Sequence, residues 1–180
     1  MSPVLLGFTL TKDLYNRKST YQRMKRSFRA GFNFGLTSGV ITTLGLMVGL
    51  NSITNSKFVV IGGVLTIALA DALSDAVAIH IAVESQDKYN SRDIWETTLS
   101  TFVYKFVFAS MFIPPLIFFE LPKAVAISAL IGFYVIFVNS LIMARLQDIS
   151  AKRVIGKHML LTIAVIIASH YIGIWISSLF

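Results

Sequence analysis

The stretch GFNFGLTSGVITTLGLMVGL, residues 31–50, decides the fold of this chain. It is long and apolar enough to cross a bilayer as one helix, since about 20 residues span the hydrocarbon core. With successive residues about 100° apart, its small residues fall within about a third of the helix circumference. They are Gly31, Gly35, Ser38, Gly39, Thr42, Gly45 and Gly49. Membrane helices associate through small residues that let backbones approach, so this face predicts a close helix contact.

The composition of the whole chain is that of an integral membrane protein. Of its 180 residues, 55% are hydrophobic and 14% are charged. The mean hydropathy of +0.72 is far above that of a soluble domain. The absence of cysteine excludes disulfides and thiolate chemistry. The net charge of +7 comes from basic residues that flank apolar stretches, which predicts membrane topology and no nucleic-acid partner.

Five stretches approach the length needed to span a bilayer as a helix. They are residues 31–50, 58–83, 97–119, 124–144 and 159–179. The connections between them are short and leave no room for a soluble domain. We therefore predict an all-α, polytopic membrane protein with five transmembrane helices in residues 31–180, preceded by a basic segment, residues 1–30. The glycines of the first span, Gly31, Gly35, Gly39, Gly45 and Gly49, are the predicted contact of a homodimer packed through that helix.

Lysine and arginine residues predict the orientation of the chain. If the N-terminus is cytoplasmic, thirteen of the sixteen basic residues flank the spans on the inside, Lys57 and Lys123 lie outside, and Lys105 lies within the third span. Cytoplasmic flanks carry the excess of Lys and Arg, so this orientation is expected, with the C-terminus outside. The segment 1–30 has two interpretations: an amphipathic helix bound to anionic lipids, or a solvated basic flank. The pattern does not indicate which cellular membrane holds the protein.

Two carboxylates, Asp71 and Asp75, interrupt the second apolar stretch. They lie four residues apart, so on a helix they are about 40° apart around the axis and about 6 Å apart along it. A carboxylate in the hydrocarbon region is costly unless it meets protein, water or a cation, and it therefore indicates a functional site. Oxygen ligands one turn apart suit a divalent cation such as Fe²⁺ or Mn²⁺, whose binding would displace protons. Glu84 and Asp87 are the predicted receptors of the ion at the inner mouth.

The same carboxylates also have a purely structural interpretation. Lys105 in the third span lies at about the depth of Asp75, so the two residues can form a buried ion pair. His170 in the fifth span is the nearest match in depth to Asp71, either as a packed residue or as a ligand or proton relay. Met47 is either a polarizable point on the transport path or a packing residue. Ser38, Thr42 and Lys105 are predicted to line the path.

No motif of a soluble enzyme is present. The sequence has no G-x-S-x-G, no H-E-x-x-H, no P-loop and no Gly-rich dinucleotide turn. We therefore predict no enzymatic activity and no tightly bound cofactor.

The chain resembles the vacuolar iron transporter family, whose members are dimeric, five-span transporters of divalent metals. The run TTLGLMVGL at residues 42–50 is similar to the family's first-helix motif T-T-L-G-L-x-x-G-L. The third-span residues Trp95, Leu99 and Phe106, and the stretch from Met159 to Gly173, resemble the family's third and fifth helices. The resemblance implies a five-helix fold, a homodimer and transport of Fe²⁺ or Mn²⁺.

The chain departs from this family at the residues that would bind metal. The family's first-helix acidic residue falls on Ser38, its second-span methionine on Asp75, and its glutamate one turn later on Ile79. The glutamate-rich cytoplasmic domain between spans two and three is replaced by the short link 84–96. The leading hypothesis is a divalent metal transporter that exports metal from the cytoplasm in exchange for protons. The alternatives are a non-transporting membrane scaffold or assembly protein, and a carrier of another solute, organic or monovalent.

Overall fold

The computed structural model describes the backbone of residues 3–86 and 88–179 and the side chains of residues 27–86 and 88–179. Within these ranges the chain consists of helices and short connections, with no strand. In chain order the helices are α1 (Pro3–Ile53), α2 (Lys57–Glu84), α3 (Ser91–Ser110), α4 (Ile113–Phe118), α5 (Leu121–Leu146) and α6 (Ala151–Ser177). The predicted all-α fold is thus confirmed for the described chain.

Five helical segments among the described residues are long and apolar enough to cross a membrane. They are Ser27–Ile53, Lys57–Glu84, Ser91–Phe118, Leu121–Leu146 and Ala151–Ser177. Each overlaps one of the five stretches predicted from hydropathy. These helices are those of an integral, multi-pass membrane protein.

The third span is divided in two by its prolines. α3 ends at Ser110, and α4 begins at Ile113 with Pro114 and Pro115 in its first turn. Proline is tolerated in the first turn of a helix because its missing N–H costs no intrahelical hydrogen bond there. The break places Phe112 and Leu116 in the interior, where both are fully buried.

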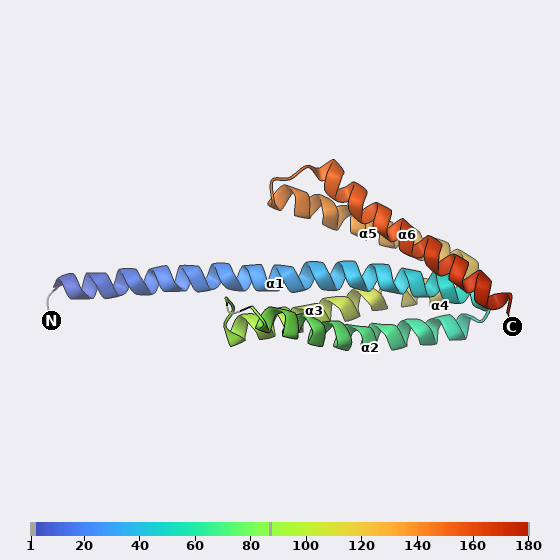
Figure 1. Ribbon diagram of the computed structural model, residues 1–180, viewed down its shortest axis with the longest axis horizontal. Coiled ribbons are helices and arrows are strands. Elements are labelled where there is room, and N and C mark those ends of the chain that lie inside the picture. The colour runs from blue at the N-terminus through green and yellow to red at the C-terminus, as the bar shows by residue number, and fades with distance from the viewer. Residues whose placement is uncertain (1–2, 87, 180) are drawn as a thin grey trace.

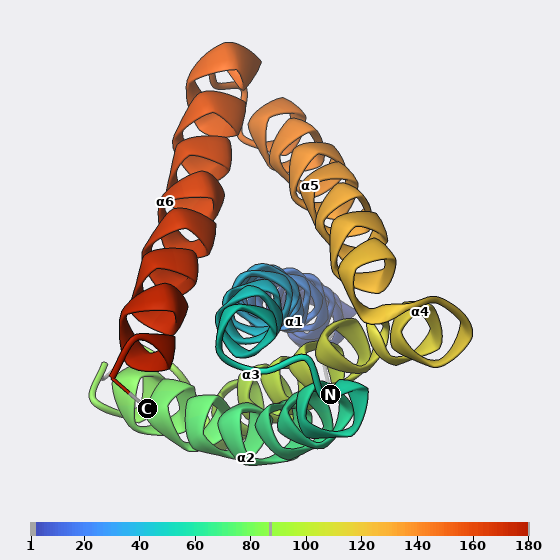
Figure 2. The ribbon, with the colours of Figure 1, turned by 90° about the vertical axis from the view of Figure 1, so that its right-hand side faces the viewer.

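α1 is the central helix of the bundle (Figures 1 and 2). It contacts α2, α3, α5 and α6. α2 and α3 lie together on one side of α1, whereas α5 and α6 lie on the other and diverge from it toward the loop that joins them (Figures 1 and 2). The two termini lie at opposite ends of the structure, as an odd number of spans requires (Figure 1).

The basic segment before the first span belongs to the same helix. α1 begins at Pro3 and continues without interruption into the span, so that its first half projects beyond the other helices (Figure 1). The segment is thus helical from Pro3 onward. Its placement on an anionic leaflet stays a prediction.

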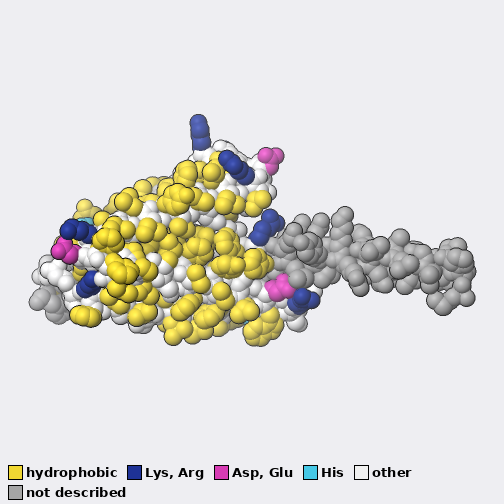
Figure 3. All heavy atoms as spheres, turned by 180° about the vertical axis from the view of Figure 1, so that it is seen from behind, with side chains coloured by type: hydrophobic (Ala, Val, Ile, Leu, Met, Phe, Trp, Pro, Cys, Tyr) yellow, Lys and Arg dark blue, Asp and Glu magenta, His cyan; other side chains and the backbone are white. Residues whose placement is uncertain are grey.

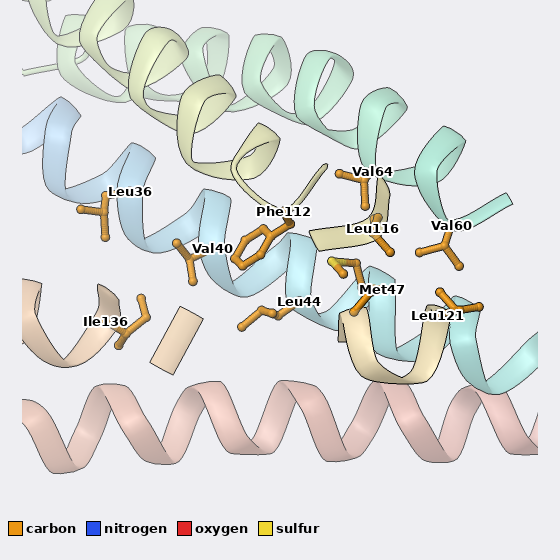
Figure 4. Close-up of a cluster of buried hydrophobic side chains, with 11 residues drawn as sticks. Leu36, Val40, Leu44, Met47, Val60, Val64, Phe112, Leu116, Leu121 and Ile136 are labelled. Carbon is orange, nitrogen blue, oxygen red and sulfur yellow. The ribbon is translucent and has the colours of Figure 1, made fainter. Parts of the chain in front are cut away.

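The main hydrophobic core lies where α1 meets α2, α4 and α5 (Figure 4). Its buried members are Leu36, Val40, Leu44, Met47, Val60, Val64, Phe112, Leu116, Leu121, Ala124 and Ile136. Most of the other large apolar side chains face outward. In the view of Figure 3 they cover the middle of the molecule, whereas charged side chains gather toward its two ends. An apolar middle between charged ends is the surface that a lipid bilayer solvates.

The glycine face of α1 packs against helices of the same chain. A Cβ atom at Gly35 would lie 2.7 Å from the carbonyl oxygen of Thr101, and one at Gly39 would lie 2.8 Å from that of Lys105. Gly31 approaches α3 in the same way. Over half of its span, α1 therefore touches α3 almost backbone to backbone.

Toward the other end of the span the same face of α1 meets α6. A Cβ at Gly45 would lie 2.9 Å from Cγ1 of Val165, and one at Gly49 would lie 3.5 Å from the carbonyl oxygen of Ser169. The predicted close contact is present, but the prediction that Gly31, Gly35, Gly39, Gly45 and Gly49 form a dimer interface is corrected. A second copy cannot occupy a face that α3 and α6 already fill.

Candidate functional site

The two intramembrane carboxylates and the intramembrane lysine meet in one cluster. Asp71 and Asp75 come from the middle of α2, and Lys105 comes from α3. Nζ of Lys105 lies 2.5 Å from Oδ2 of Asp71 and also contacts Oδ2 of Asp75. The ion pair between Asp75 and Lys105, one of the two interpretations of the sequence, is therefore formed, and Lys105 bridges to Asp71 as well. We call these three residues the Asp–Lys–Asp triad.

Two hydroxyl groups of α1 complete the contacts of the triad. Oγ of Ser38 donates a hydrogen bond to Oδ2 of Asp75 at 2.8 Å. Oγ1 of Thr42 lies 3.2 Å from Oδ2 of Asp71 and 2.8 Å from the carbonyl oxygen of Ser38, and its single proton can serve only one of these acceptors at a time. Ser38 and Thr42 thus lie against the two carboxylates, and that they line a transport path stays a prediction.

Every one of these contacts is made to an Oδ2 atom. Among the residues that the structure describes, Oδ1 of Asp71 and Oδ1 of Asp75 have no hydrogen-bond partner. The carboxylate side chains are 29% and 23% exposed, whereas that of Lys105 is only 1% exposed. Lys105 therefore lies behind the two carboxylates, and each carboxylate keeps one oxygen available.

The triad is not balanced in charge. With all three groups ionised, two carboxylates face one ammonium, and the net charge is −1. Unpaired charge is expensive in a medium without water, since charges there interact through a low dielectric. The site therefore has room for one further positive charge.

The small residues of α1 explain how a lysine reaches this position. A Cβ at Gly39 would lie 3.3 Å from Cγ of Lys105, so a larger residue there would obstruct the lysine stem. Because Gly35 and Gly39 bring α3 close to α1, the Lys105 side chain passes beside α1 to the carboxylates of α2. The glycine face and the acidic pair, two separate features of the sequence, thus form one site.

Two residues predicted to lie on the transport path, Met47 and His170, lie away from the triad. Met47 is fully buried in the hydrophobic core, so its interpretation as a packing residue holds. Nδ1 of His170 lies 2.8 Å from Oγ of Ser52, whose own proton is donated to the carbonyl oxygen of Val48. Ser52 lies ten residues beyond Thr42 on α1, about 15 Å along the helix. His170 therefore ties α6 to α1 away from the triad, and its place on a transport path stays a prediction.

Glu84, one of the two predicted inner-mouth residues, lies apart from the triad. Glu84 is exposed at the last residue of α2, nine residues and about 13 Å along the helix from Asp75. Asp87 lies outside the described residues. In the part of the chain that the structure describes, no three His, Asp or Glu side chains are grouped as metal ligands. The carboxylate pair is therefore the only part of the predicted metal set that is assembled there.

One buried acidic residue was not singled out from the sequence. Asp93, in the first turn of α3, is 1% exposed, and its Oδ2 has no hydrogen-bond partner among the described residues. It begins a line of buried polar residues that recurs every fourth position of α3 and continues with Thr97, Thr101 and Lys105. That spacing is visible in the sequence, but a carboxylate so close to a helix start is ordinarily solvated.

An open groove of about 540 Å³ leads to the triad between α1 and α2. It is lined by Leu46, Leu50, Val59, Gly63, Thr66, Ile67, Ala70 and Asp71. A second groove, of about 380 Å³, lies between α1, α2 and α6 and includes Thr42 and Ser169. Asp71 is the charged residue of these linings, so the first groove connects the lipid-facing surface with one edge of the triad.

No family model, no curated protein and no solved structure matches this chain. The likeness to the vacuolar iron transporter family therefore rests on the motifs quoted above, and its functional implications are proposals.

Proposed function

We propose that this protein is a carrier that moves a cation across a membrane through Asp71 and Asp75, in exchange for protons. The charge imbalance of the triad carries the proposal: two carboxylates share one ammonium in the middle of the spans. An ion pair that only joined helices would be expected to balance its charges, because excess charge in hydrocarbon is costly. A net negative site instead suits a cation that arrives and leaves.

Fe²⁺ or Mn²⁺ is the cargo that we propose. Paired carboxylate oxygens suit these ions, and the family resemblance implies the same class of substrate. A divalent ion added to the closed triad would leave an excess positive charge, so Lys105 must withdraw as the metal enters. Ser38 and Thr42 would hold the carboxylates in place meanwhile. Protons are the proposed counter-ions, because carboxylates that release metal can take them up.

The remaining parts of the proposal follow from the sequence. The excess of basic residues places the N-terminus in the cytoplasm and the C-terminus outside. Glu84 is then at the cytoplasmic end of α2, where it can attract the ion before transport. The family resemblance implies a homodimer, and because the glycine face of α1 is filled within one chain, the dimer contact must use another surface.

A second function, that of a membrane scaffold without transport, is favoured by one observation. Both carboxylates contact Lys105, and hydroxyl groups of α1 lie against them, so the three helices are joined at this point. In this reading the triad determines how α1, α2 and α3 pack and binds no cargo. The two functions differ in whether a cation moves.

Flux through proteoliposomes distinguishes the two functions. We expect purified protein to admit Mn²⁺ down its gradient, measured by quenching of an enclosed metal-sensitive dye, with protons moving in the opposite direction. Asp71→Asn and Asp75→Asn should abolish the flux. Glu120→Gln removes a carboxylate from an exposed pair with Lys123 and should leave the flux unchanged. Equal flux in wild type and both aspartate variants would refute transport through the triad, and no flux in folded wild type would favour the scaffold.

A further inference from the structure

We infer that the groove between α1 and α2 binds a lipophilic organic cation with a single positive charge, such as a bulky phosphonium or a protonated hydrophobic amine, and that Asp71 holds the charge. The ligand class differs from the divalent cargo proposed above. The inference concerns the same carboxylates, but it does not require that anything be transported.

The shape of the groove suits a compact organic molecule. Its volume of about 540 Å³ lies within the usual range for sites that bind small organic ligands. Leu46 and Leu50 of α1 form one wall, and Ile67 and Ala70 of α2 belong to the other. A hydrated metal ion would lose water in this groove without gaining ligands from walls of this kind. An organic cation with an apolar body gives up little hydration when it enters the groove.

The charge of the triad suits one positive charge and not two. With Lys105 in place and all three groups ionised, the triad would carry −1, so a monovalent cation would neutralise it and a divalent ion would overshoot. Oδ1 of Asp71 has no hydrogen-bond partner among the described residues, and Asp71 lines the groove. A monovalent cation can therefore be accepted without displacing Lys105 from Oδ2.

Access from the lipid is the third requirement, and the groove meets it. The groove is open on the outer surface of the spans, so a ligand dissolved in the bilayer can enter sideways. The apolar walls contribute little binding free energy, because the ligand leaves a lipid environment that is equally apolar. Most of the affinity must then come from the charge at Asp71, which is strong in a low dielectric. We therefore predict that removing the charge of Asp71 weakens binding more than changing the apolar walls of the groove does.

Binding of tetraphenylphosphonium to the full chain in lipid nanodiscs tests the inference. We expect saturable binding by wild type and none of the neutral triphenylphosphine oxide, which has a similar apolar body. Asp71→Asn, which keeps the shape of the side chain, should weaken binding at least about tenfold, because a contact between charged groups is lost. Tetraphenylphosphonium that binds Asp71→Asn as tightly as wild type, or the neutral compound binding equally well, would overturn the inference.

A second pair of variants locates the ligand without altering charge. Ala70→Phe places a ring in the groove from an exposed position of α2 and should weaken binding severalfold. Ala78→Phe makes the same change two turns away, at an exposed position outside the groove lining, and should bind like wild type. Equal binding by these two variants would exclude the groove. Mn²⁺ flux measured on the same preparations separates the two proposals, because phosphonium binding without flux refutes only the transport of metal.

Discussion

Replacing Lys105 by methionine is the sharpest test of how the triad is built. Methionine retains much of the stem of the side chain, which is 1% exposed, but removes the ammonium that contacts both carboxylates. The net charge of the site then changes from −1 to −2 with no hydrogen-bond donor in place of Nζ. Asp71→Asn instead changes the net charge from −1 to 0 and leaves Lys105 paired with Asp75.

These charge changes predict very different losses of stability. Removing one partner of a buried ion pair costs about 3 to 5 kcal/mol. Because the side chains of Asp71 and Asp75 are 29% and 23% exposed, we expect the lower end of that range for Lys105→Met, about 3 kcal/mol. Asp71→Asn should cost about 1 kcal/mol or less, because the amide oxygen can still accept a hydrogen bond. For a chain of this size, about 1 kcal/mol corresponds to roughly 2 to 4 °C in Tm.

The difference in stability between the two variants can be measured by thermal unfolding in detergent micelles. The readout is the fraction of protein that stays monodisperse after heating. We expect Tm to fall by about 6 to 12 °C for Lys105→Met and by about 4 °C or less for Asp71→Asn. Lys123→Met removes a lysine from an exposed ion pair with Glu120 and should shift Tm by about 3 °C at most. If Asp71→Asn proves as damaging as Lys105→Met, the charge count behind the triad is wrong.

Two further predictions concern packing and topology. Gly35→Ala should destabilise the protein by about 1 to 3 kcal/mol, because the new Cβ would lie 2.7 Å from the backbone of α3. Gly62→Ala has nothing within 4 Å of its new Cβ and should stabilise the protein by about 0.5 to 1 kcal/mol. Equal Tm shifts for the two variants would contradict the close approach of α1 to α3. Because the chain has no cysteine, Glu84→Cys and Lys123→Cys place single thiols at opposite ends of the bundle. In oriented membrane vesicles an impermeant maleimide should label Glu84→Cys only from the cytoplasmic side and Lys123→Cys only from the other, and labelling of both from one side would refute the five-span topology.

The sequence predicted the helices well and their partners poorly. Span positions depend on local hydropathy, so five apolar stretches were enough to locate five helices. Proline chemistry explains why the third span breaks just before Pro114. The small face of α1 correctly indicated a close contact. It did not indicate which helix makes that contact, because glycine permits any backbone to approach. α3 and α6 fill this face from within the chain, which excludes the dimer interface predicted there.

The candidate site shows the same division. Asp71, Asp75 and Lys105 were recognised individually, since each ionisable residue in a span is anomalous by itself. Lys105 lies at about the same membrane depth as Asp75, and the sequence therefore suggested it as a partner. For Asp71 the sequence offered no cationic residue at so similar a depth. The structure shows one lysine serving both, because two carboxylates one turn apart lie within reach of a single Nζ.

The sequence by itself determined that this chain is a multi-helix membrane protein with acidic residues in its spans, because hydropathy and residue type are properties of each position. Only the tertiary structure decided that the glycines of α1 serve the packing of one chain, that His170 and Met47 lie away from the acidic pair, and that one lysine, Lys105, contacts two carboxylates. Compensation of charge depends on distances between helices, and those distances are set by which faces pack together.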